Sequence, residues 1–233
     1  MKTSPSSIVR IALAAAIGGA VLASFIHGAA LAGEVSYGGK IGFIMANISG
    51  TPKEWDDNTS YRTGFTGGVY LSYAFDEDFS IEPEILYTVK GVKSNLYEYE
   101  DLVSVDLTAS FSYIEIPVLL TYTFSGAQKV KPRVYAGPSF AYNLSSEVEI
   151  AAWPLSVSAD VSSLTHVTDF GIVAGGGISY PFDQGALTLD ARFQYGFTNV
   201  IMSGDFNVNG SPETISVDDF KNYGFSVMIG YGF

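Results

Sequence analysis

The sequence contains no cysteine among its 233 residues. Disulfide bonds, a thiol nucleophile and a lipid-modified cysteine are therefore excluded. Basic residues are also few, with 12 Lys and Arg against 24 Asp and Glu, which gives a formal net charge of −12. This acidity would repel the phosphates of nucleic acids, so we expect no nucleic-acid partner.

Long apolar runs are absent, except near the start of the chain. There, Lys2 and Arg10 precede an apolar stretch over 11–26, and Ala30-Leu31-Ala32 follows with the small-x-small pattern of a cleavage site. This is the layout of a secretory signal peptide. A membrane-anchoring helix is the alternative, but it needs about 20 apolar residues. The sequence therefore predicts a signal peptide over 1–32 and one exported domain over 33–233.

Alternation with a period of two runs through the rest of the chain, and no segment shows sustained helical periodicity. It predicts eight strands, over 34–46, 63–75, 79–90, 109–124, 132–144, 167–182, 186–199 and 221–233. The connections at 76–78, 125–131 and 181–185 are short, whereas those at 47–62, 91–108, 145–166 and 200–220 are long. Short periplasmic turns and longer external loops are typical of transmembrane barrels. The fold expected is all-β, an eight-stranded antiparallel up-and-down barrel with both termini periplasmic.

One face of each predicted strand is free of charge, as in Val35, Tyr37, Gly39, Ile41, Phe43 and Met45. The opposite face is mixed and holds many small residues together with charges, namely Lys40, Glu82, Glu84, Lys90, Glu115, Arg133, Asp169, Asp190 and Arg192. A soluble barrel would place its apolar face inside. Small residues among the charges suit a crowded lumen, and the apolar face continues over all eight strands. These features favour a barrel whose apolar face contacts lipid.

Aromatic residues stand at both ends of the apolar face, as expected where a barrel wall meets the two membrane interfaces. The periplasmic set is Phe75, Phe79, Tyr122, Phe124, Tyr180, Phe182, Tyr231 and Phe233, and the external set is Phe43, Phe65, Tyr87, Tyr142, Phe170, Phe197 and Tyr223. The last strand ends on Phe233, which we expect at the periplasmic interface. Pairing of this strand with the first would leave no free edge in lipid.

Several strand motifs resemble a known family. They are PEILYTVKG (83–91), YIEIPVLLTY (113–122), RVYAGPSFAY (133–142), LTLDARFQYGFTNV (187–200) and YGFSVMIGYGF (223–233). They are similar to the outer-membrane β-barrel domain of porin-family type, with the architecture of small OmpA- and OmpX-like barrels. The resemblance implies a Gram-negative outer membrane, with its lipid and lipopolysaccharide as partners. It also implies that Tyr231 and Phe233 form the signal read by the barrel-insertion machinery.

Six charged residues on the inward face fall in the periplasmic half by register: Glu82, Glu84, Glu115, Arg133, Asp190 and Arg192. Paired carboxylates can act in acid–base catalysis, and a charged lumen can form a narrow gated pathway. However, an eight-stranded barrel is just wide enough for side chains, and buried charges need partners. We therefore interpret these six residues as a structural ion network that fills the lumen.

Other chemistry has little support in the sequence. His166 lies near Ser162 and Ser163 in an external loop, which leaves a surface lipid-modifying enzyme as a remote hypothesis. The acidic segments at 53–58, 97–106 and 217–220 lack the spacing of a calcium-binding loop. We expect no catalytic residue, metal or cofactor. Trp55 and Trp153 are candidate anchors for a loop partner that the sequence does not name.

Three prolines conflict with the strand assignment, because Pro83, Pro117 and Pro138 each remove a ladder donor. We expect bulges or unpaired carbonyls there, and the predicted strand bounds are most open to a register error near Pro117. The function expected is structural or surface interaction through four external loops. The alternative is a small channel that weakly favours cations because its loops are acidic.

Overall fold

The computed structural model describes residues 34–50, 59–99, 103–126, 129–152, 155–200, 204–208, 211–215 and 220–233. The expectations for a signal peptide over 1–32, for Trp55 and Trp153, and for the segment 53–58 lie outside these ranges. Among the residues described, there is no helix with the length and apolarity needed to cross a membrane.

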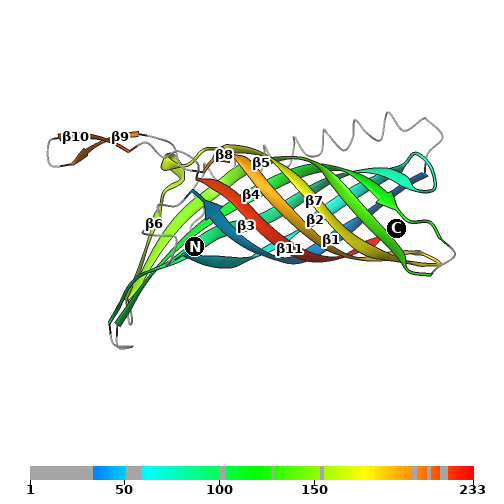
Figure 1. Cartoon of the computed structure of the whole chain (residues 1–233), viewed down its shortest axis with the longest axis horizontal. Helices are drawn as coiled ribbons and strands as arrows, with labels where there is room; N and C mark the ends of the chain where they lie inside the picture. The colour runs from blue at the N-terminus through cyan, green and yellow to red at the C-terminus, as the bar shows by residue number, and fades with distance from the viewer. Residues whose placement is uncertain are drawn as a thin grey trace.

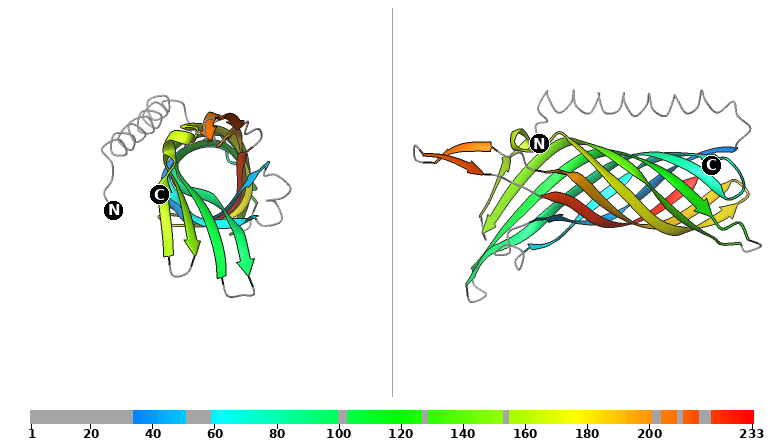
Figure 2. Two further views of the ribbon diagram at one scale, coloured as in Figure 1. Left: turned by 90° about the vertical axis from the view of Figure 1, so that its left-hand side faces the viewer. Right: turned by 45° about the horizontal axis from the view of Figure 1, so that its top comes forward.

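Eight strands form a closed antiparallel barrel (Figure 1). They are β1 (Glu34–Ser49), β2 (Thr59–Ala74), β3 (Phe79–Tyr99), β4 (Val103–Thr123), β5 (Lys131–Ala152), β7 (Thr168–Phe182), β8 (Gly185–Asn199) and β11 (Lys221–Gly232). Each strand pairs with its neighbours in the chain, and β1 also pairs with β11. The predicted fold class is confirmed, and the ring is visible along the barrel axis in Figure 2.

The pairing of β1 with β11 continues to the last residue. The backbone N–H of Phe233 donates to the carbonyl of Tyr37 at 2.8 Å, and the N–H of Tyr37 donates back to Phe233 at 3.3 Å. The closing strand therefore offers no free edge to lipid, where unpaired backbone groups would cost several kcal/mol each.

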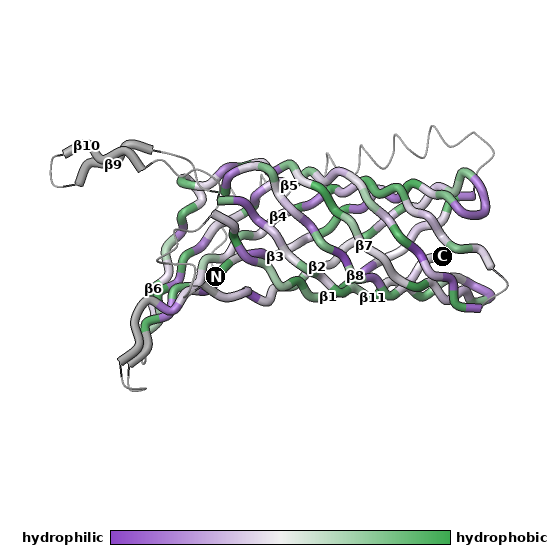
Figure 3. The backbone as a smooth tube through the Cα atoms, viewed as in Figure 1, coloured by the Kyte–Doolittle hydropathy of each residue, from purple (hydrophilic) through white to green (hydrophobic). Residues whose placement is uncertain are grey.

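The faces alternate along every barrel strand, so that hydrophilic and hydrophobic positions follow one another in Figure 3. Phe43 is 69% exposed on the outside, whereas its near neighbour Lys40 is only 1% exposed on the inside. This arrangement is opposite to that of a soluble barrel, whose apolar face lies inside. Two leucines at positions where the alternation predicts an outward side chain, Leu71 of β2 and Leu144 of β5, are instead buried.

Three connections are short, at 75–78, 124–130 and 183–184, and they lie at the end of the barrel that holds the C-terminus (Figure 1). The predicted long loops at 91–108 and 145–166 are wrong in large part. Strands β3, β4 and β5 continue through them, and β6 (Leu155–Asp160) folds back on β5. The single turn η1 (Ser162–Leu164) follows, and β9 (Gly204–Val208) pairs with β10 (Ser211–Ile215) as a separate hairpin.

Of the bulges or unpaired groups predicted at the prolines, the bulges are absent from these described strands, and missing pairs occur at two of the three sites. Pairing between β3 and β4 lapses for two residues after Pro83 and resumes in the same register at Leu86. Pairing between β4 and β5 does the same after Pro117. Pro138 pairs with Ile172 in an unbroken register. A missing donor therefore removes local pairs without inserting a residue, and the register near Pro117 is continuous.

Candidate functional site

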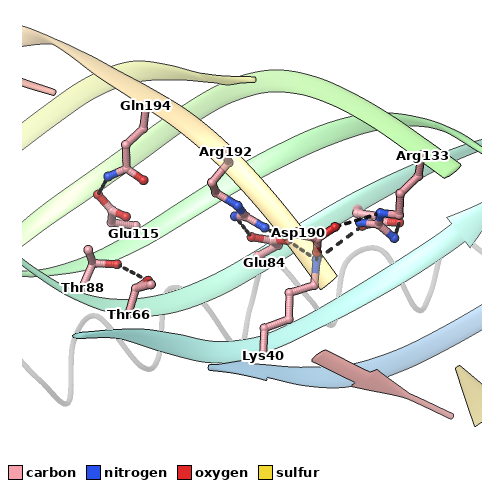
Figure 4. A network of polar contacts seen from close by, with 10 residues as sticks. Lys40, Thr66, Glu84, Thr88, Glu115, Arg133, Asp190, Arg192 and Gln194 are labelled. Carbon is pink, nitrogen blue, oxygen red and sulfur yellow. Dashed lines mark hydrogen bonds and ion pairs between the residues drawn. The ribbon is translucent and has the colours of Figure 1, made fainter. Parts of the chain in front are cut away.

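Lys40 of β1 lies at the centre of an ion network inside the barrel. Its Nζ is 2.7 Å from Glu84 Oε1, 3.4 Å from Asp190 Oδ2 and 3.7 Å from Glu82 Oε2. Lys40, Glu84 and Asp190 are each at most 1% exposed. Figure 4 shows these groups converging from opposite walls of the lumen. A single ammonium therefore links β1 to both β3 and β8.

Two arginines complete this network through paired hydrogen bonds. Arg133 donates to both oxygens of Glu82, at 3.2 and 2.8 Å, and its Nε lies 3.2 Å from Asp190 Oδ1. Arg192 donates to both oxygens of Glu84, at 2.7 and 3.3 Å. Bidentate pairs of this kind are shorter and stronger than neutral hydrogen bonds, and they also fix geometry.

The network is electrically balanced, with three cations and three carboxylates. Removing these charges from water costs several kcal/mol for each ion, and close pairing offsets that cost. Two tyrosine rings add to the cation environment. Lys40 Nζ lies 4.5 Å from the centre of the Tyr70 ring, and both arginines lie 5.3 Å from that of Tyr135. The neutral sum means that no charge in the network is left uncompensated.

The network spans the lumen because of strand geometry. Successive side chains point to opposite faces, so residues two apart point inward together. This places Glu82 beside Glu84 on β3 and Asp190 beside Arg192 on β8. On the remaining wall, Tyr135 packs with two buried residues, Leu119 of β4 and Val173 of β7. Side chains thus fill the cross-section at this level.

A second polar layer lies towards the end of the barrel with the long strands. Lys90 Nζ is 2.5 Å from Glu115 Oε1, and Gln194 donates to the same oxygen at 3.4 Å. Thr66 and Thr88 share a hydrogen bond of 3.0 Å nearby (Figure 4). A cavity of about 10 Å³ lies beside Lys90 and Glu115. Glu115 therefore belongs to this second layer, with Lys90 and Gln194, and not to the network around Lys40.

The sequence prediction brought six residues together, and the structure brings five of them into one network. Lys40 and Lys90 were not among the six. The sequence does place both lysines on the inward face, because they fall there when residues are counted with a period of two. Their ion-pair partners could not be predicted, because they are far away in the sequence: Lys40 contacts a carboxylate 44 residues away. Whether these contacts serve only to hold the barrel together stays a prediction.

An apolar cluster lies beyond the polar layers. Its buried members are Ile48, Val92, Ala109, Phe111, Tyr113, Ala141 and Val200, and Val148 and Phe220 pack against them. Asn222 donates to the Tyr113 hydroxyl at 3.1 Å at this level. At the opposite end, a cavity of about 570 Å³ opens between the short turns and reaches Glu82 and Arg133. The ion network and the apolar cluster therefore lie between this cavity and the other end of the barrel.

A family model described as an outer membrane protein beta-barrel domain matches residues 27–202. The chain belongs to this family. Membership supports a bacterial outer-membrane location, and it leaves the role of the barrel open. A search of curated proteins finds no match.

Solved structures of outer-membrane barrels are among the similar proteins. Neisserial surface protein A (NspA) is 15% identical with a TM-score of 0.40, over 84% of this chain and 95% of its own. OprG from Pseudomonas aeruginosa is 12% identical with a TM-score of 0.48, over 87% and 96%. The attachment invasion locus protein Ail of Yersinia pestis is 15% identical with a TM-score of 0.38, over 86% and 99%.

The outer wall of this family member carries the expected aromatic residues. Exposed members near the short turns are Phe75, Phe79, Phe124, Phe182, Tyr231 and Phe233, and those towards the other end are Phe43, Phe65, Tyr87, Phe170 and Phe197. The ring of Phe233 lies 4.8 Å from that of Tyr231 and 5.9 Å from that of Tyr37. The role of Tyr231 and Phe233 as an assembly signal stays a prediction.

His166 and Ser162, the residues considered for a surface enzyme, make separate contacts with the backbone. His166 is exposed, and its backbone N–H donates to Val200 at 2.9 Å. The Ser162 hydroxyl accepts a hydrogen bond from the backbone of Ser146, also at 2.9 Å. Within the ranges described above, no group of three or more His, Cys, Asp or Glu residues is placed to hold a metal ion.

Proposed function

We propose that this protein is a sealed outer-membrane barrel whose function is surface interaction at its external end. The observation that carries the proposal is the network around Lys40, which joins β1, β3, β5 and β8 across the lumen. A conducting pore needs a continuous wet path. Paired ions, Tyr135 and the apolar cluster occupy that path, and this supports a barrel that does not conduct.

Two other surfaces complete the proposal. The apolar outer wall is the contact surface for outer-membrane lipid and lipopolysaccharide. Tyr231 and Phe233 serve as the signal that the barrel-insertion machinery reads during assembly. The regions left for interaction with other molecules are then the external connections and the sheet formed by the long strands.

Planar-bilayer conductance of residues 33–233 tests the seal. We expect no current from the native protein and discrete current steps from the double variant Arg133→Ser/Arg192→Ser. Because that variant leaves carboxylates unpaired, Glu82→Ser with Arg133→Ser serves as a second variant, which removes one charge of each sign. Lys93→Ser, at an exposed position outside the ion network, is the matched control. Stable steps from the native protein would overturn the proposal.

The second candidate is a small channel that weakly favours cations. The cavity of about 570 Å³ favours it, because this space opens at the end with the short turns and is lined in part by Glu82 and Arg133. In this case the network would be a gate rather than a permanent seal. Current steps from the native protein, with a reversal potential that indicates cation preference, would favour this function over the sealed barrel.

A further inference from the structure

The long strands form a sheet that continues beyond the barrel, and β6 is its open edge (Figures 1 and 2). All six residues of β6 pair with β5, from Glu147↔Asp160 to Ala152↔Leu155. On its other side, no strand in the described part of the chain pairs with β6. Outer-membrane barrels carry their longer connections outside the cell, so this edge is presented to the exterior.

A bulge at Leu144 determines which side chains line the two faces of this sheet. Tyr113 pairs with Asn143 and Ser112 pairs with Ser145, so Leu144 has no partner in the ladder. One extra residue reverses the faces of the strand beyond it. Even-numbered residues of β5 point to lipid before Leu144, whereas beyond it they continue the side that lines the lumen.

This inner side of the sheet is apolar. Across β4, β5 and β6 the paired rows are Ala109, Val148 and Ala159, then Leu107, Ile150 and Val157, then Val105, Ala152 and Leu155. Val148 packs against the apolar cluster at the barrel mouth. At the edge, Leu155 and Val157 are 74% and 72% exposed. The apolar surface thus begins in the lumen and ends uncovered at β6.

The outer side of the same sheet is acidic. Asp106, Glu147, Glu149 and Asp160 lie on it, separated by small residues such as Ser156 and Ser158. Asp160 accepts a hydrogen bond from the backbone of Ser162 at 2.8 Å. Glu147 and Glu149 are exposed on β5, next to the edge strand. Lys93 is on the same side, but it belongs to β3, three strands from the edge.

We propose that β6 binds an extended peptide as an additional strand, and that this peptide alternates apolar and basic residues. Open backbone groups on an edge bind a strand through main-chain hydrogen bonds, and alternate side chains supply specificity. Apolar side chains of the partner would cover Leu155 and Val157, and basic ones would face Glu147 and Glu149. This inference rests on the proposed function, because it names the class of partner for the external end.

Charge favours such a peptide over a second copy of this chain. A second copy presents the same acidic side and the same net charge of −12, so its approach is repelled. The edge itself does not make this choice, because it lacks the Lys, Pro or bulge with which soluble proteins usually block self-pairing of an edge strand. The β6 sequence Leu-Ser-Val-Ser-Ala-Asp contains none of these, which leaves the edge available.

The test uses residues 33–233 in lipid nanodiscs and a fluorescent hexapeptide, Lys-Val repeated three times, with anisotropy as the readout. We expect saturable binding that Val157→Lys weakens at least about tenfold, equal to a loss of roughly 1.4 kcal/mol. Leu164→Lys, at another exposed apolar position outside the sheet, is the matched control and should change binding less than about twofold. Glu149→Lys should weaken binding and reduce its salt dependence.

Three results would overturn the inference. One is equal binding of a Glu-Val hexapeptide, and another is binding that Val157→Lys leaves unchanged. The third is self-association through β6. Ultracentrifugation would then show dimers of the native protein and monomers of the Val157→Lys variant. Far-UV circular dichroism of each variant reports whether the barrel is folded. Conductance of the same preparation tests the seal, so a failed seal and a failed peptide site give different results.

Discussion

Lys40 Nζ and Glu84 Oε1 lie 2.7 Å apart inside the barrel, and both side chains are fully buried. The two residues belong to β1 and β3, so their contact crosses over β2 within the lumen. Asp190 and Glu82 share the same ammonium, at 3.4 and 3.7 Å. One side chain therefore neutralises part of three carboxylates, and removing it affects all of them together.

Lys40→Met keeps the length of the side chain and removes its charge. We expect a loss of about 3–5 kcal/mol in the free energy of unfolding, because it leaves buried carboxylate charge uncompensated. Urea unfolding in lipid vesicles at neutral pH measures this loss. Lys93→Met is the matched control, since Lys93 is exposed, and it should change the same free energy by less than about 0.5 kcal/mol. Equal effects of the two variants would contradict a structural role for the network.

Gly91 lies in β3 where its pairing with β2 shifts register, between the Thr66–Thr88 and Tyr61–Val92 pairs. Its φ is +156°, and a Cβ added there would collide with the carbonyl oxygen of Ala109. Gly91→Ala should therefore cost about 1–3 kcal/mol in the free energy of unfolding. Gly126→Ala is the control, because nothing lies within 4 Å of its added Cβ. The claim fails if both alanine variants unfold at the same urea concentration.

Asp76 organises the turn between β2 and β3. Its Oδ1 accepts hydrogen bonds from the backbone N–H of Phe79 at 2.7 Å and of Asp78 at 2.9 Å. These bonds, that of Phe79 first, lower the pKa of the Asp76 carboxyl below its ordinary value of 3.8. A carboxyl with a lowered folded-state pKa stabilises the fold above its unfolded pKa, and this contribution is lost as the pH falls through the folded-state pKa.

Asp76→Ala should therefore destabilise the barrel at pH 7, and the difference from the native protein should shrink progressively below about pH 3.9. Urea midpoints measured from pH 7 down to pH 2 give this difference. Glu77→Ala, at an exposed position in the same turn, is the control. A difference for Asp76→Ala that stays constant over the whole range would show that the charge of this carboxyl does not stabilise the turn.

Phe233 ends the closing strand, and its ring contacts those of Tyr37 and Tyr231. If Phe233 is part of an assembly signal, Phe233→Ser should lower the amount of protein in the outer membrane while refolding into detergent stays efficient. Fractionation of cells, beside refolding of the purified chain, separates the two effects. Tyr37→Ser removes another aromatic from the same interface and should leave assembly intact. Equal losses from both variants would assign Phe233 to the lipid interface alone.

The sequence by itself determined the eight barrel strands, the side that faces lipid and the closing role of the last strand. Each of these depends on a period of two, which can be counted along the chain without knowing any partner. The inward positions of Lys40, Glu84 and Arg192 follow from the same counting. Even the short turns could be placed, because polar clusters interrupt the alternation there.

Only the tertiary structure decided which charges meet. Strand tilt and stagger set the height of each side chain in the lumen, and they placed Glu115 with Lys90 instead of with the network around Lys40. The bulge at Leu144 also reverses the faces of β5. The period of two is interrupted there, so the sequence predicts a loop where the strand in fact continues. Pairing between strands fixes both features, and a period read along one strand contains no information about the register of its neighbours.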